Sequence, residues 1–216
     1  MSSFTHFISL PLGIHPQLVD KLNEFKRSIL TSNEYKAAGF RIDESIFAIP
    51  ESLHLTVLML DLKGENIAKA SSVLQSVSDK LMEALKNRPI SIQLRGLACM
   101  KGSPDEAWIV YAPVLEVGEQ GRLQQQHLTL KLPSSSQTAV ARYRDECKVQ
   151  EEVTHCPDAS FDARKIFEKY AEHEWGEYLI PEIHLCQRRR FDESGHYYFC
   201  SSLPLPGNMQ AERASE

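Results

Sequence analysis

The sequence contains one short pattern twice: histidine, leucine and threonine followed by an aliphatic residue. The pattern occupies residues 54–57 and returns at residues 127–130. Both copies lie in apolar runs typical of β-strands, where successive side chains point to opposite faces. The imidazole and hydroxyl of each copy therefore share one face, and the leucine between them points to the other face.

Two such strands side by side would present two imidazoles and two hydroxyls to a shared groove. A reference pKa near 6.5 lets one neutral imidazole accept a proton while the other, protonated, donates one to a leaving oxygen. Hydroxyls beside them would hydrogen-bond the phosphoryl oxygens. The pattern predicts phosphodiester chemistry without a metal or cofactor, with His54 and His127 as catalytic residues and Thr56 and Thr129 as phosphate-binding residues. It does not decide which histidine is the acid.

Two other features admit both a structural and a functional interpretation. His184 repeats the spacing but is followed by Cys186 instead of a hydroxyl, so we interpret it as an ordinary strand histidine, with a place in the groove as the alternative. The arginine run 188–190 could contact phosphate, but such runs are more often solvated strand ends.

Composition restricts the class of protein. A chain of 216 residues with 42% hydrophobic and 25% charged residues fits one globular domain. Its formal charge of −5 excludes a nucleic-acid binder driven by bulk electrostatics, while small phosphorylated ligands and RNA ends remain open. The sequence has no membrane-spanning apolar run and no signal-peptide profile, so we expect it in the nucleus or cytoplasm. Five widely spaced cysteines indicate neither disulfides nor a zinc site.

Hydrophobic periodicity predicts an α+β domain with several hairpins. Strands are expected at 6–12, 53–60, 90–94, 108–115, 127–132, 180–188 and 196–202, and helices at 16–30, 67–85 and 161–170. Turns are expected at 102–105 and 192–195. The polar stretch 133–160 is expected to be a mobile loop, with a short helix near 140–147, and 209–216 a frayed tail.

The two His-x-Thr strands resemble the paired motif of the two-histidine (2H) phosphoesterase superfamily. Residues 6–12, 45–56, 161–167 and 175–176 are similar to the phosphoesterase-like domain shared by A-kinase anchor protein 7 and the activating signal cointegrator 1 complex, with the cointegrator branch the closer match. The resemblance covers nearly all of residues 5–208, which we expect to form one such domain.

This resemblance implies a bilobal fold with antiparallel sheets around a central groove, each lobe contributing one His-x-Thr strand. It implies hydrolysis or formation of 2′,3′-cyclic phosphate or 2′,5′ linkages at RNA ends, with a nucleotide or RNA terminus as ligand. The alternative is a non-catalytic subunit of a helicase-containing cointegrator complex that acts in transcription regulation and alkylation-damage repair.

The spacing within the two halves differs. Residues 13–53 separate the first strand from His54 and leave room for a helix, whereas only residues 116–126 separate the strand ending at Leu115 from His127. A helix of average length, about 11–12 residues, does not fit there with its turns. The second lobe is therefore expected to lack a helix of the family, through a splice variant or a gene-model error, which would weaken its core.

Overall fold

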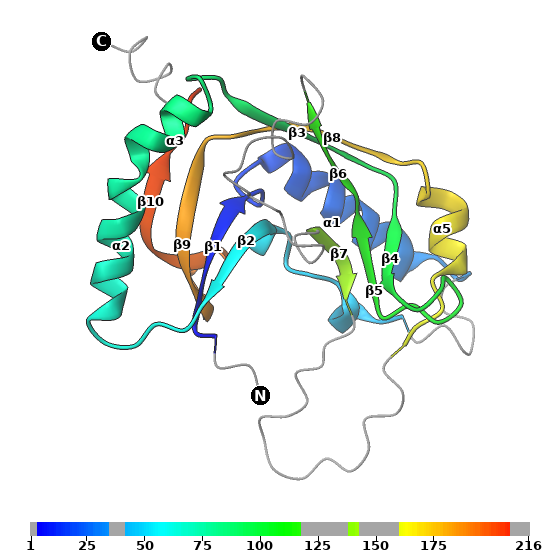
Figure 1. Cartoon of the computed structure of the whole chain (residues 1–216). Coiled ribbons are helices and arrows are strands. Elements are labelled where there is room, and N and C mark those ends of the chain that lie inside the picture. The colour runs from blue at the N-terminus through cyan, green and yellow to red at the C-terminus, as the bar shows by residue number, and fades with distance from the viewer. Residues whose placement is uncertain (1–3, 35–41, 118–137, 143–159, 208–216) are drawn as a thin grey trace.

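The computed structural model describes residues 4–34, 42–117, 138–142 and 160–207 (Figure 1). These residues form an α+β domain in which every sheet is antiparallel. The elements of the first half are β1 (His6–Pro11), α1 (Pro16–Thr31), the 3-10 turns Glu44–Ile46 and Pro50–Ser52, β2 (His54–Leu60), α2 (Asn66–Ser76), α3 (Ser78–Ala84), β3 (Ile90–Arg95) and β4 (Ala98–Lys101). Those of the second half are β5 (Ile109–Ala112), β6 (Val114–Val117), β7 (Thr138–Arg142), α5 (Arg164–Tyr170), β8 (Glu174–Ile180), β9 (Glu182–Phe191) and β10 (Tyr197–Pro204).

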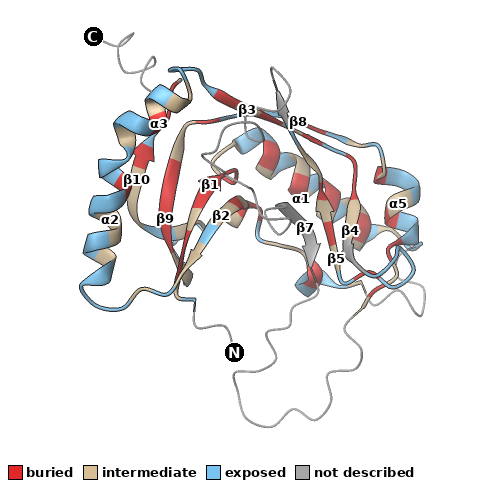
Figure 2. Ribbon diagram, in the orientation of Figure 1, coloured by how far each residue is buried: buried red, intermediate tan, exposed pale blue. Residues whose placement is uncertain are grey.

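The largest sheet has the strand order β10-β9-β1-β2, so the C-terminal hairpin pairs with the N-terminal strand. Leucines on one face of this sheet, including Leu10, Leu55 and Leu185, are buried in the hydrophobic core. Helices α2 and α3 run along β10 at the outer side of the domain (Figures 1 and 2). The other face carries the side chains of His54 and Thr56 from the first His-x-Thr motif.

Helix α1 connects this sheet to the rest of the domain. Its apolar stripe is fully buried, as its sequence period predicts. The ring of Phe25 packs edge-on against Trp175 of β8, at 5.2 Å between centroids, and against Tyr170 of α5, at 4.8 Å. Trp175 donates from Nε1 to the Gly96 carbonyl at 2.9 Å. The sheet β6-β3-β8 is thereby fixed against α1.

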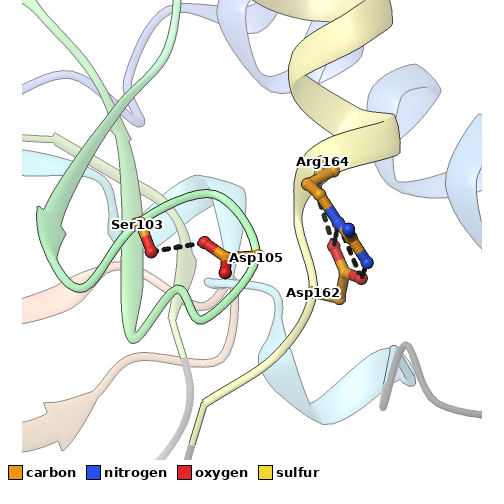
Figure 3. Close-up of polar contacts among 4 residues, drawn as sticks. All are labelled: Ser103, Asp105, Asp162 and Arg164. Atoms are coloured by element: carbon orange, nitrogen blue, oxygen red, sulfur yellow. Dashed lines mark hydrogen bonds and ion pairs between the residues drawn. The ribbon is translucent and has the colours of Figure 1, made fainter.

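The segment before α5 is attached to the β4–β5 connection through the bridge between Ala107 and Phe161. Figure 3 shows the polar contacts within each of the two segments. In the turn, Ser103 donates its hydroxyl proton to Asp105. Asp162 accepts from the backbone N–H and from Nε of Arg164, each at 3.0 Å, and so forms an Asx turn immediately before the helix. The side-chain hydrogen bond from Arg164 holds the pKa of Asp162 below its usual value. These contacts position Ala163, whose N–H donates to the Pro104 carbonyl at 2.7 Å.

Most of the predicted elements within the described residues are confirmed, with several corrections. The helix expected at 67–85 is two helices that meet at Val77, where Ser76 donates its hydroxyl to the Val73 carbonyl and competes with the helical backbone. The strand expected at 108–115 is divided by Pro113, because proline has no N–H to donate to a ladder. Its first part pairs, across the expected turn at 102–105, with β4, a strand that was not expected, and its second part pairs with β3, the expected hairpin partner.

The other two corrections concern the second half of the chain. Residues 138–142, expected to be loop leading into a short helix, form strand β7 beside β5. Strand β8 was not predicted, because glutamates and Gly176, which has a φ of 126°, interrupt its apolar alternation. The strand expected at 127–132, the missing helix after Leu115, the rest of the loop 133–160 and the tail 209–216 lie outside the described residues.

Candidate active site

The first His-x-Thr motif opens strand β2, and its imidazole is held in one tautomer. The preceding 3-10 turn places the Ser52 carbonyl 2.8 Å from Nδ1 of His54. A carbonyl only accepts, so Nδ1 carries the proton and Nε2 of the neutral ring carries the lone pair. The Thr56 hydroxyl lies 3.1 Å from Nε2 and donates to it. His54 and Thr56 therefore share one face, as predicted, with the basic nitrogen beside the hydroxyl.

Aromatic side chains fix the His54 ring in place. Phe7 of β1 lies 4.8 Å from it between ring centroids, and Tyr197 of β10 meets it edge-on at 5.1 Å. Phe7 and Tyr197 also pack edge-on against each other, at 5.0 Å. Among the described residues, two hydrogen bonds and two rings thus orient the imidazole before any ligand binds, which lowers the cost of ordering it during a reaction.

His54 lies in the wall of a pocket of about 240 Å³. The remaining lining comes from β1, the segment before β2, and the C-terminal hairpin: Ser9, Pro11, Ile14, Glu51, Ser52, Leu53, Glu182, His184, Cys186, Asp192, His196, Tyr197 and Phe199. This mixture of apolar walls with a few polar groups is typical of small-molecule sites. His127 and Thr129, the second predicted pair, lie outside the described residues.

A row of polar side chains crosses the sheet at the level of the motif. Thr56 is opposite Ser9, Ser9 is opposite His184, and His184 is opposite Ser202 in the registers of the three strand pairs. Directly paired residues point to the same face of a sheet. Neighbouring strands lie about 4.8 Å apart, so His184 is roughly 10 Å from Thr56 across the sheet. His184 therefore lines the pocket, which was the alternative interpretation of its sequence.

His184 is the most enclosed of the pocket's imidazoles, with 7% of its surface exposed. Its ring stacks on Phe199 at 4.5 Å between centroids and 21° between planes. Glu182 Oε1 lies 2.9 Å from Nε2, outside hydrogen-bond geometry, and no other described residue hydrogen-bonds this nitrogen. A buried polar atom in this state is uncommon and marks a place where a ligand or a charged partner can act.

The remaining reactive groups of the pocket are less suited to catalysis. Burial raises the pKa of the Cys186 thiol to about 11, although Ser9 lies 3.4 Å from its sulfur, so the thiol is neutral near pH 7 and a poor nucleophile. Partial burial would raise the pKa of Asp192. Hydrogen bonds from Ser194 and from the His196 N–H outweigh that effect and hold it below its usual value. Asp192 therefore serves the hairpin turn as a carboxylate.

Metal-binding and membrane-spanning features are absent from the part of the chain that the structure describes. Nowhere in those ranges do three or more histidine, cysteine or acidic side chains converge in a way that could hold a metal ion. None of the helices in the same ranges combines the length and the apolar character that crossing a bilayer requires.

The described residues combine an antiparallel α+β fold with a histidine of the first His-x-Thr motif in a pocket wall, and comparison with known proteins gives the family. Residues 4–205 match the family model of the AKAP7 2′5′ RNA ligase-like domain. The chain belongs to this family, which confirms the resemblance seen in the sequence.

Two curated proteins are similar to this chain. Activating signal cointegrator 1 complex subunit 1 of Mus musculus is 24% identical over 93% of this chain and 62% of its own length. The uncharacterized protein C15D4.13c of Schizosaccharomyces pombe is 32% identical over 49% of this chain and 48% of its own. The match therefore spans less than two thirds of either relative.

Solved structures with a similar arrangement include Escherichia coli LigT complexed with NADP+, at 15% identity and a TM-score of 0.49, covering 94% of this chain and 97% of that one. TT0787 of Thermus thermophilus is similar at 16% identity and a TM-score of 0.48, covering 94% and 98%.

The sequence motif found His54 and Thr56 but not the groups that the C-terminal hairpin brings to them. Ser9, Tyr197 and Phe199 were not predicted as pocket residues, and His184 was favoured as structural. The one available signal was the repeated histidine spacing at His184, because nothing local in the sequence shows that β9 pairs with β1.

Proposed function

We propose that this protein is a phosphoesterase that acts on RNA-type phosphodiesters, either 2′,3′-cyclic phosphates or 2′,5′ linkages, by metal-free acid–base catalysis with two histidines. The observation that carries the proposal is the state of His54. Its Nδ1 proton is committed to the Ser52 carbonyl, and Nε2 lies beside the Thr56 hydroxyl in a pocket wall. His127 and Thr129 are assigned to the second half of the site from their identical sequence pattern.

The chemistry proceeds by transfer of two protons. For a cyclic phosphate, one neutral imidazole takes a proton from water as the water oxygen attacks phosphorus. The bond from phosphorus to one ribose oxygen breaks, and the other imidazole, protonated, gives its proton to that oxygen. The hydroxyl of Thr56 turns from His54 to a phosphoryl oxygen, where charge accumulates, and the same task is assigned to the hydroxyl of Thr129 from its identical sequence pattern. The pattern leaves open whether His54 begins as base or acid.

The test is turnover of 2′,3′-cyclic nucleotides and 2′,5′-linked short RNAs between pH 6 and 8. Loss of an acid or base typically costs 10²- to 10⁴-fold, so the His54→Ala, His127→Ala double variant should be inactive. Thr56→Val should lower kcat by roughly 10²-fold, as for the loss of an oxyanion donor. Thr31→Val, at an exposed threonine of α1, is the matched control. Wild-type turnover no greater than that of the double variant would refute the proposal.

A second candidate function is non-catalytic membership of a cointegrator-type complex in transcription regulation and alkylation-damage repair, in the nucleus, the cytoplasm or both. The observation that favours it is the match to the mouse complex subunit over 93% of this chain. The test is affinity purification of the tagged full chain. A stable helicase-containing assembly that survives the double histidine substitution supports this function, and a chain that remains monomeric contradicts it.

A further inference from the structure

The arginine run at residues 188–190 lies within strand β9, and the proposed chemistry gives it no task. In the pairing of β9 with β10, residues 187–190 bulge out of the ladder opposite Tyr198. Arg189 has a φ of 63°, a left-handed backbone that a residue with a Cβ rarely adopts. Such strain persists only where the surrounding structure imposes it, and it occurs often at functional positions. The run is therefore a formed bulge and not the solvated strand end that its sequence favoured.

The guanidinium groups of this bulge have no carboxylate partner among the described residues. Arg188 donates to the Phe4 carbonyl at 3.4 Å, and Arg190 donates to Oε1 of Gln187 at 3.2 Å, so both acceptors are neutral. Arg189 and Arg190 are exposed. None of the ion pairs between described residues includes any of the three arginines. A chain with a formal charge of −5 thus keeps uncompensated positive charge at this place.

The acidic residues that follow the run do not neutralise it. Asp192 accepts hydrogen bonds from the N–H groups of Ser194 and His196, and so serves the hairpin turn. No ion pair joins Asp192 or Glu193 to an arginine of the bulge within the described part of the chain. The positive charge therefore remains available to an anion from outside the chain.

Tyr198 orients one of the guanidinium groups. The guanidinium carbon of Arg190 lies 3.9 Å from the centroid of the Tyr198 ring, which is a cation–π contact. The planar guanidinium presents its N–H groups as a fork that matches two oxygens of a phosphate. Because the ring holds this group before any ligand binds, Arg190 is oriented for a phosphate at low entropic cost.

The bulge is connected to the candidate site through two ring contacts. Phe191, which follows the run, packs on Tyr197 at 4.5 Å between centroids, and Tyr197 meets the His54 ring at 5.1 Å. Proteins that hold single strands follow the backbone with positive charge over about 4–16 nucleotides. An RNA strand whose end lies at His54 therefore has further phosphates within reach of the bulge.

We propose that the bulge at residues 188–190 contacts the phosphate backbone of an RNA strand whose end occupies the pocket, so that the protein binds a strand more tightly than a mononucleotide. This inference rests on the proposed function for the class of ligand, RNA. It adds a contact outside both His-x-Thr strands and gives the acidic chain a local attraction for a polyanion.

The salt dependence of RNA binding tests this contact. The full chain is titrated with a fluorescein-labelled RNA of about ten nucleotides that ends in a 3′-phosphate, and anisotropy gives the affinity between about 50 and 200 mM salt. Each phosphate contact on a single strand steepens the slope of log affinity against log salt by about 0.7. Arg189→Gln with Arg190→Gln should flatten the slope by about 1.4, so the wild type should lose about 7-fold more affinity than this variant over the range.

Two arginines elsewhere supply a control of equal charge. Arg27 of α1 and Arg95 of β3 are exposed, and neither lines the pocket. Arg27→Gln with Arg95→Gln should leave the slope unchanged. An equal flattening in the two double variants would mean that net charge alone acts, and it would overturn the proposal.

A mononucleotide separates the bulge from the pocket. Adenosine 3′-phosphate has one phosphate, so its affinity should be equal in the wild type and in the protein with Arg189→Gln and Arg190→Gln. A parallel loss for this ligand would place the damage in the pocket and overturn the proposal. Binding of phosphatidylserine vesicles through these arginines, without binding of the RNA, would also overturn it.

Turnover distinguishes this inference from the proposed function. If RNA binding depends on the bulge but the wild type turns over no 2′,3′-cyclic phosphate, the contact stands and the proposed catalysis fails. If the wild type turns over RNA ends and the salt slope is the same without Arg189 and Arg190, the catalysis stands and the contact fails.

Discussion

Trp175 packs the sheet β6-β3-β8 against helix α1, so its replacement by phenylalanine should destabilise the whole fold. The side chain is fully buried, and its Nε1 is the donor to the Gly96 carbonyl. Leaving that buried carbonyl unpaired costs about 1–3 kcal/mol. The smaller ring also leaves a cavity worth roughly 1 kcal/mol. The sum is a loss of about 2–4 kcal/mol of unfolding free energy.

The measurement is thermal unfolding followed by far-UV circular dichroism. In a chain of this size each kcal/mol lowers the Tm by roughly 2–4 °C, so Trp175→Phe should lower it by about 5–15 °C. The chain offers its own control, because the only other tryptophan, Trp108, is 41% exposed. Trp108→Phe should shift the Tm by less than about 2 °C. Equal shifts in the two variants would refute the idea that the buried Trp175 side chain holds the sheet β6-β3-β8 against α1.

Three other predictions concern positions close to the site. Gly13→Ala should lower the free energy of unfolding by about 1–3 kcal/mol or more in urea titrations, because a Cβ there would lie 2.1 Å from the Glu51 carbonyl oxygen. Cys186, with its pKa of about 11, should resist iodoacetamide at pH 8 in the folded protein and react after unfolding, as mass spectrometry will show. Burial lowers the pKa of His6 and of His15. The unfolded chain then binds more protons below about pH 6.5, so the Tm should fall as the pH drops from 7 towards 5.

The parts of the fold with a strong local period were predictable, and the parts set by distant pairing were not. Helix α1 and strands β1 and β2 show clear periods in the sequence, and each appears near its expected bounds. Strand β8 could not be recognised, because Gly176 and its glutamates interrupt the pattern while its buried partners come from β3 and α1. A buried strand in this position is defined by what packs on it and not by its own alternation.

The same distinction applies to the candidate site. His54 and Thr56 are two residues apart on one strand, so their common face follows from strand geometry alone. Ser9 meets them through the pairing of β1 with β2, whereas His184 and Phe199 meet them only because the C-terminal hairpin pairs with β1, across almost the whole length of the chain. A bulge in β9 makes the pairing of this hairpin harder to predict from the sequence. Tyr197 pairs with Phe191 and Phe199 with Cys186, so four residues of β9 face Tyr198 alone.

The charge distribution bears on the proposal that this acidic chain acts on an RNA end. A formal charge of −5 gives little general attraction for a polyanion. Among the described residues, the candidate site offers the imidazole of His54 and the hydroxyl of Thr56. The carboxylates of Glu51, Glu182 and Asp192 line the same pocket as His54. For the proposed function, the orientation of His54 and Thr56 must hold the phosphate, because carboxylates line the same pocket, including Glu51 in the turn before His54, and they repel a phosphate. Specific placement of one phosphate then replaces the electrostatic attraction that the chain as a whole lacks.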